Sequence, residues 1–187
     1  MSEQVTNMTQ LNISTPFQLF QKMAQQGRQR AVDLPVQNDT EGQWRGVGFQ
    51  LAGTRFITPM AEVDEVLYMP SCTRFPGVKP WVTGVANVRG RLLSVIDLGV
   101  FFGSKSSVSS KKCRVLTIKY NDLYTGVIVE EVLGIQSLNA ATKVDKVTIN
   151  ELYKPYVAGG FEQDGRHWTI FSLSKLVQAP EFLQVAV

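Results

Sequence analysis

The chain has 187 residues and a formal net charge of +3, with 44% hydrophobic and 19% charged residues. A chain of this length buries on the order of 70% of its unfolded surface, so a core needs no metal or disulfide to stabilise it. The small charge does not favour a nucleic-acid binder, and no stretch approaches the roughly 18 apolar residues of a membrane span. The N-terminus lacks the basic and apolar regions of a signal peptide, which predicts a cytoplasmic protein.

The first 43 residues are expected to form an N-terminal extension. Residues 1–43 are mostly polar, but Pro16 suits the first position of a helix, and apolar residues after it fall on one face. This pattern predicts a helix over about 15–31. The sequence leaves open whether the helix packs on its own chain or offers its apolar face to a partner.

From Trp44 onward the sequence is typical of short strands. Runs of β-branched and aromatic residues alternate with Gly, Pro or Asn turns, without βαβ alternation, and this favours a mainly β fold. Hairpins are expected around turns at Gly53, Gly90, Asn121 and Gly165. The other expected elements are a third strand at 63–67, a Ser/Lys linker at about 104–112, an irregular segment at 136–155 with a short helix near 150–156, and a final helix over 174–183 interrupted by Pro180.

The densest apolar signal lies in residues 82–103, which read VTGVANVRGRLLSVIDLGVFFG. Two apolar runs flank a tight turn at Arg89-Gly90, and this pattern predicts a β-hairpin. Arg89 would place a fork of N–H donors at the hairpin tip, where it suits a carboxylate. We expect it to form an ion pair with Glu65. Asp97 ends the second run and is expected to cap a short helix.

The two halves of the chain resemble each other. Residues 63–67 (VDEVL) align with 129–133 (VEEVL), and residues 82–101 align without a gap with 157–176. A five-stranded unit of this kind is marginal alone, so two units are expected to share a core. We predict two linked five-stranded β-barrels, since closed barrels remove exposed sheet edges. The duplication leaves open an exchange of strands between the barrels.

No constellation of catalytic or metal-binding residues is recognisable. His167 is the only histidine, and no phosphate-binding or nucleophile motif is present, so we predict no catalytic site, no cofactor and no metal. The enzyme alternative is a small hydrolase that would use Asp97 and His167. Cys72 and Cys113 match no metal or redox spacing. They are expected as buried or free thiols, although a disulfide between them stays open.

The order of these motifs is similar to that of the CheW family of chemotaxis coupling proteins. A V-x-E-V element begins at Val63, the sequence GVANVRG covers 84–90, VIDL covers 95–98, and a G-x-x-V-[DE]-x-V element begins at Gly126. The resemblance covers about residues 44–177 and leaves 178–187 as a tail. The N-terminal extension and the sequence around the GVANVRG motif resemble those of family members that serve the type IV pilus (Pil-Chp) system and twitching motility.

The resemblance implies the same fold, two five-stranded barrels with a shared core, and a non-catalytic adaptor. Its partners would be the cytoplasmic tip of a methyl-accepting chemoreceptor and the CheW-like regulatory domain of a CheA-type histidine kinase, at membrane-associated receptor arrays but without membrane insertion or nucleic acid. The alternative is a regulatory CheW-like module that binds receptor or kinase but not both. The positions that correspond to partner-binding residues of the family are Val63, Glu65, Gly84, Asn87, Val88, Arg89 and Gly90.

Two positions depart from the family pattern. Ser94 stands where many members have Pro, so the strand that contains it is expected to pair differently. Ser172 replaces the acid often found at the second-half equivalent of Asp97. The second-half equivalent of Arg89 is Asp164, so the duplication kept the turn but not its charge. We therefore place the function of the first hairpin at its tip.

Overall fold

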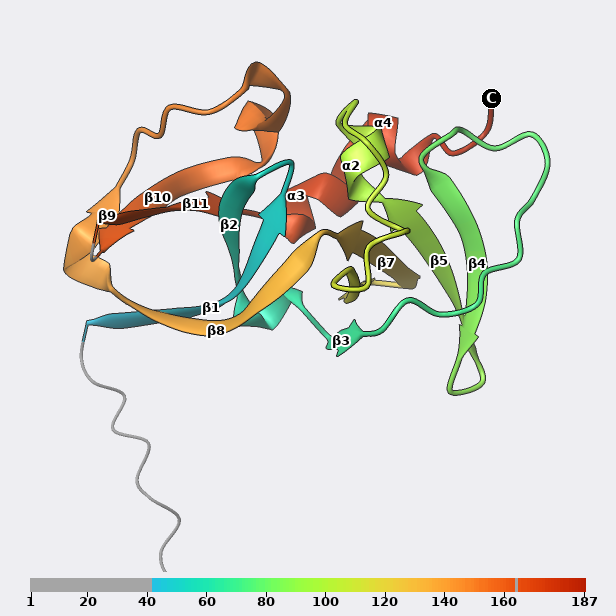
Figure 1. Ribbon diagram of the computed structural model, residues 1–187, viewed down its shortest axis with the longest axis horizontal. Coiled ribbons are helices and arrows are strands. Elements are labelled where there is room, and N and C mark those ends of the chain that lie inside the picture. The colour runs from blue at the N-terminus through green and yellow to red at the C-terminus, as the bar shows by residue number, and fades with distance from the viewer. Residues whose placement is uncertain (1–41, 164) are drawn as a thin grey trace, which may run out of the picture. The chain divides into compact units, whose positions relative to one another are not determined.

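The computed structural model describes residues 42–163 and 165–187 (Figure 1). The predicted helix over 15–31 lies outside these residues. The six-stranded sheet consists of β1 (Gln43–Leu51), β2 (Thr54–Pro59), β8 (Glu131–Asn139), β9 (Lys143–Val144), β10 (Val157–Gln163) and β11 (Arg166–Phe171). The five-stranded sheet consists of β3 (Glu65–Leu67), β4 (Val82–Val88), β5 (Arg91–Asp97), β6 (Arg114–Tyr120) and β7 (Leu123–Val129). The helical elements are η1 (Met60–Glu62), α2 (Leu98–Phe101), η2 (Ala140–Thr142), η3 (Glu151–Tyr156), α3 (Leu173–Gln178) and α4 (Pro180–Leu183).

Each sheet combines strands from both halves of the chain. The strand orders are β8-β1-β2-β11-β10-β9 and β3-β6-β7-β5-β4. In the two repeats, β1, β2, β3, β4 and β5 correspond to β6, β7, β8, β10 and β11, respectively. With these correspondences, the first five strands of the six-stranded sheet follow the same order as the strands of the five-stranded sheet. In both sheets one parallel pair, β2–β11 or β5–β7, joins two antiparallel hairpins. The two repeats have therefore exchanged their first hairpins, so neither repeat can complete a sheet without the other.

The shared core combines apolar residues of both sheets and of the helices. Phe49, Phe56 and Phe171 are fully buried in it, with ring centroids 5.5 to 6.0 Å apart. Aromatic pairs at such separations add stabilisation beyond their buried area. This cluster joins the two halves into one folding unit.

Each sheet also encloses a core of its own, as expected for a small barrel. Leu116 and Val127 face the shared core, whereas their neighbours Val115 and Ile128 belong to the cluster inside the five-stranded sheet. Successive side chains of a strand point to opposite faces, so central strands with two buried faces are apolar throughout. The inner cluster receives residues from all five strands. The predicted mainly β fold of two barrel-like units with a common core is thus confirmed, with β9 as an added sixth strand.

The duplication is also visible in local hydrogen bonds. Asp97 N–H donates to the Trp81 carbonyl, and Ser172 N–H donates to the Tyr156 carbonyl, both at 2.8 Å. Asp97 and Ser172 cap α2 and α3, respectively, by accepting a hydrogen bond from the third residue after each. The equivalent turns therefore follow the gapless alignment of 82–101 with 157–176.

The alignment of VDEVL with VEEVL is wrong in register. Glu65 pairs with Thr117, three residues before the end of β6, whereas Glu131 pairs with Gln50, one residue before the end of β1. A bulge between Gly48 and its neighbour shifts the β1–β8 ladder. The two acids therefore do not occupy equivalent positions, because η1 lengthens the connection from β2 to β3, whereas only Glu130 separates β7 from β8.

Two further expectations differ from the structure. β8 continues to Asn139, beyond the predicted irregular start at 136, because it pairs with β1 from Gln43 to Gln50. The 178–187 tail packs on the domain, since Phe182 is buried in the shared core and Ala186 forms a bridge with Val78. Ser94 itself pairs with Val85 of β4 on one side and with Thr125 of β7 on the other, next to a bulge between Val82 and Gly84.

Candidate functional site: the tip of the β4–β5 hairpin

The β4–β5 turn is a two-residue loop with an unusual residue in it. Val88 pairs with Arg91, so Arg89 and Gly90 form the loop, with φ angles of 52° and 79°. Positive φ at both positions is the geometry of a type I′ turn, which favours Asn or Asp followed by Gly. An arginine in this region is sterically strained. The Arg89 backbone therefore adopts an unfavourable conformation, which places its side chain at the tip of the turn.

Asn87, the residue before Val88, stabilises this turn. Its side-chain Oδ1 accepts a hydrogen bond of 2.9 Å from Gly90 N–H. An Asn that accepts from a backbone N–H in this way mimics a turn of the main chain. Asn87 is exposed, but its acceptor is occupied within the turn, so its clearest role is to hold Arg89 in place.

Arg89 forms an ion pair with Glu65, with 2.5 Å between Nη2 and Oε1. Glu65 lies on β3 and Arg89 follows β4, the two edge strands of the five-stranded sheet. The ion pair therefore joins the two edges of the curled sheet. Exposed pairs of this kind contribute about 0–1 kcal/mol to stability. Orientation of the arginine is the more important consequence, because the Arg89 side chain is 78% exposed and that of Glu65 is 27% exposed.

The neighbouring β6–β7 hairpin extends this charged surface. Lys119 Nζ lies 2.7 Å from Asp64 Oδ1, and the Arg91 guanidinium stacks 4.3 Å above the Tyr124 ring. Leu92, the next residue of β5, is 73% exposed. Tyrosine and arginine are residue types that anchor protein interfaces. We call the following set the tip surface: Asp64, Glu65, Arg89, Arg91, Leu92, Lys119 and Tyr124.

The remaining predicted site residues support the tip rather than forming its surface. Val63 is half-buried against the shared core, and Val88 packs on the cluster inside the five-stranded sheet. Gly84 is buried, with a φ of 142°, and an added Cβ would lie 2.3 Å from the Thr73 carbonyl oxygen. Thr73 pairs with Val85 through two backbone hydrogen bonds of 2.8 and 2.9 Å. Glycine at position 84 therefore allows the preceding loop to cover the edge of β4.

Sequence reasoning missed the part of the tip surface that β6 and β7 supply. Lys119 and Tyr124 are directly opposite each other across the β6–β7 pair. Their proximity to the GVANVRG turn depends on strand order, which places β6 beside β3 and β7 beside β5. No local signal in the sequence around Asn121 indicates this arrangement.

The groups considered for catalysis lie apart and have structural partners. Asp97 is 2% exposed, accepts from Val100 N–H at 3.2 Å and accepts from the Ser106 hydroxyl. His167 lies on the other sheet with its side chain 73% exposed, and its nearest charged partner is Glu162 at 3.9 Å. Within residues 42–163 and 165–187, no group of three or more His, Cys, Asp or Glu side chains is placed to hold a metal.

The two cysteines are free thiols that pack on the cluster inside the five-stranded sheet. Cys113 is buried and Cys72 is half-buried. Burial raises the pKa of the Cys72 thiol, which lowers the fraction of reactive thiolate at neutral pH. The thiols therefore act as small apolar residues in this fold.

Comparisons with known proteins give a consistent family assignment. A family model described as the CheW-like domain matches residues 45–181. The chain is 41% identical over 177 residues to Protein PilI of Pseudomonas aeruginosa, covering 94% of this chain and 99% of PilI. It is 29% identical over 94 residues to Chemotaxis protein CheW of Helicobacter pylori, covering 50% of this chain and 57% of that protein.

A solved structure gives the same assignment. The scaffolding protein TtCheW from Thermoanaerobacter tengcongensis superposes with a TM-score of 0.62 at 25% identity, covering 70% of this chain and 89% of TtCheW. No helix in the described part of the chain is long and apolar enough to cross a membrane. The chain belongs to the CheW-like family of non-catalytic scaffold and adaptor proteins.

Proposed function

We propose that the chain couples a methyl-accepting chemoreceptor to a CheA-type histidine kinase in a pathway that controls type IV pili and twitching motility. The similarity to PilI along almost the whole of both chains supports the pathway, and the family supports the adaptor role. The protein would act in the cytoplasm at receptor arrays. The kinase would be recognised through its CheW-like regulatory domain and the receptor through its cytoplasmic tip.

The tip surface is the proposed partner-binding site, and the exposed Arg89–Glu65 pair is the observation that carries it. Arg89 occupies a strained turn position although its side chain adds little to stability. Strain of this kind is retained where a side chain has a function. In this proposal Arg89 and Glu65 contact the partner, whereas Val63, Gly84, Asn87, Val88 and Gly90 shape the hairpin that presents them.

A three-component binding experiment tests the coupling role. The purified chain would be mixed with a tagged receptor tip and with the regulatory domain of the kinase, first separately and then together. An adaptor retains the kinase domain on the tagged receptor only when the chain is present. Binding of either partner alone, with no ternary complex, would instead support the alternative of a regulatory CheW-like module that binds one partner at a time.

A further inference from the structure

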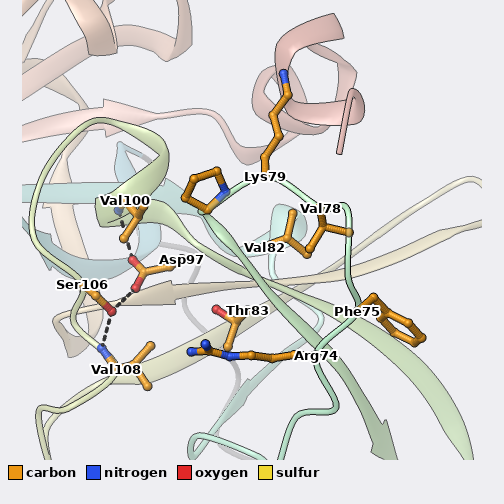
Figure 2. A pocket seen from close by; sticks show the side chains of 11 residues that line it. Arg74, Phe75, Val78, Lys79, Val82, Thr83, Asp97, Val100, Ser106 and Val108 are labelled. Carbon is orange, nitrogen blue, oxygen red and sulfur yellow. Dashed lines mark hydrogen bonds between the residues drawn. The ribbon is translucent and has the colours of Figure 1, made fainter. Parts of the chain in front are cut away.

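A cleft lies at the opposite end of the β4–β5 hairpin from Arg89 (Figure 2). Its volume is about 340 Å³, and it lies between the loop that precedes β4, the start of β4 and the linker that joins the two repeats. The seven residues of β4 separate it from the tip surface by roughly 20 Å. We call it the linker cleft; the lining residues used below are Arg74, Lys79, Val82, Val100, Ser106 and Val108.

The linker wall of this cleft is held by a buried carboxylate. Asp97 Oδ2 accepts a hydrogen bond of 2.5 Å from the Ser106 hydroxyl, and Ser106 Oγ accepts from Val108 N–H at 3.3 Å. Asp97 Oδ1 accepts from Val100 N–H at the start of α2. Figure 2 shows these bonds as a chain from α2 to the linker. The polar groups of this wall are therefore satisfied internally, and Val82, Val100 and Val108 provide apolar surface beside them.

The charges that border the cleft are mainly positive. The Arg74 side chain extends across the cleft toward Thr83 and Val108, whereas the Lys79 side chain begins at the edge of the cleft and points away from the other labelled side chains (Figure 2). Lys105 is exposed in the linker directly before Ser106. Within the described residues, none of these three cations takes part in a salt bridge. The one acid of the cleft, Asp97, is 2% exposed and already accepts hydrogen bonds on both oxygens.

We propose that the linker cleft binds an acidic segment of a partner protein. One aliphatic side chain of the segment would enter between the valines, and an adjacent Asp or Glu would pair with Arg74. Charge complementarity of this kind selects partners and accelerates their association. A nucleic acid is less suited, because single-strand binding uses several stacking aromatics and the cleft offers only Phe75. An adaptor would thereby gain a second contact that does not overlap the tip surface.

A titration of the 15N-labelled full chain with a blocked Asp-Glu-Leu-Glu-Asp peptide tests this site. Amide shifts are expected around the cleft, with saturation below about 5 mM. Arg74→Glu combined with Lys79→Glu should weaken binding by about tenfold or more, because two attractive charges become repulsive. The matched control is Arg45→Glu with Lys146→Glu, which changes the same net charge at two exposed positions and should alter the dissociation constant by less than about twofold.

A second variant and two control ligands make the result decisive. Ser106→Ala leaves every charge unchanged but removes the bond that fastens the linker, and it should weaken peptide binding by about threefold. The proposal is overturned if the peptide causes no shifts, if a Gln-for-acid peptide binds equally, or if the control variant loses as much affinity as the cleft variant. Equal shifts with inorganic phosphate would identify a simple anion site and would also overturn it.

Discussion

Glu62 and Ser172, which are 110 positions apart, are joined by a hydrogen bond of 3.0 Å from the Ser172 hydroxyl to Glu62 Oε1. Glu62 also accepts from the backbone N–H groups of Leu173 and Ser174 at the start of α3. A carboxylate at the N-terminus of a helix accepts hydrogen bonds from free N–H donors and interacts favourably with the positive end of the helix dipole. A carboxylate from the first repeat thus completes the cap of a helix in the second repeat.

Replacing Glu62 by Gln is expected to lower the free energy of unfolding by about 1–2 kcal/mol, since charge-assisted hydrogen bonds to backbone donors are lost. Urea unfolding of the two proteins measures the difference. Glu151→Gln is the matched control, because that side chain is 82% exposed and pairs only with nearby Lys154. Equal losses in the two variants would show that Glu62 does not join the repeats energetically.

Replacing Gly84 by Ala should destabilise the fold by about 2 kcal/mol or more, because the new Cβ would meet a backbone carbonyl and the φ angle is unfavourable. Gly53→Ala separates the two causes. Gly53 has a φ of 72° but no atom within 4 Å of an added Cβ, so it should cost only about 1 kcal/mol. Thermal unfolding of both variants checks the order, and equal costs would contradict the close approach of Thr73.

Asn87 is expected to position Arg89 without touching the partner. Asn87→Ala removes the acceptor for Gly90 N–H and should weaken binding of the kinase regulatory domain by about fivefold through loss of preorganisation. Asn87→Asp keeps the acceptor oxygen and should restore most of the affinity. Calorimetry of the three proteins gives the comparison. A loss in the Asp variant as large as in the Ala variant would show that the side-chain amide itself meets the partner.

Acid stability is expected to depend on Tyr156. Its hydroxyl donates to Glu181 at 2.7 Å and lowers the pKa of that carboxyl from the ordinary value of 4.5. A lowered folded-state pKa contributes stability above the unfolded value and loses it as pH falls through the folded value. Tyr156→Phe should therefore reduce stability at pH 7 and flatten its decline below about pH 4.5. Urea midpoints measured between pH 7 and pH 3 test this, and parallel curves would refute it.

Local chemistry made the first hairpin and its helix cap predictable. Arg89-Gly90 lies between two apolar runs, and Asp97 directly precedes an apolar turn, so neighbouring residues determine both structures. Neither feature needs knowledge of strand order. The expected pairing of Glu65 with Arg89 does form, but across the two edge strands of the curled sheet, and this closure is not encoded locally.

The rest depends on relations between distant segments. The exchange of hairpins brings Lys119 and Tyr124 beside β3 and β5, and no residue near them encodes it. Glu131 follows β7 after a single residue, whereas η1 lies between β2 and Glu65, so the two acids are not equivalent. The role of Glu62 is not visible in the sequence, because its partners lie about 110 positions away. Long-range pairing is decided by the summed burial of both faces of a strand, which local patterns do not report.

The central claim is that Arg89 serves binding rather than folding, and Arg89→Asn tests it most directly. Asparagine tolerates the left-handed conformation of this turn, so the free energy of unfolding should stay within about 0.5 kcal/mol of the original or rise. The affinity for the kinase regulatory domain or for the receptor tip, measured by calorimetry, should fall by about tenfold or more. Unchanged affinity for both partners in a folded Arg89→Asn protein would contradict the account.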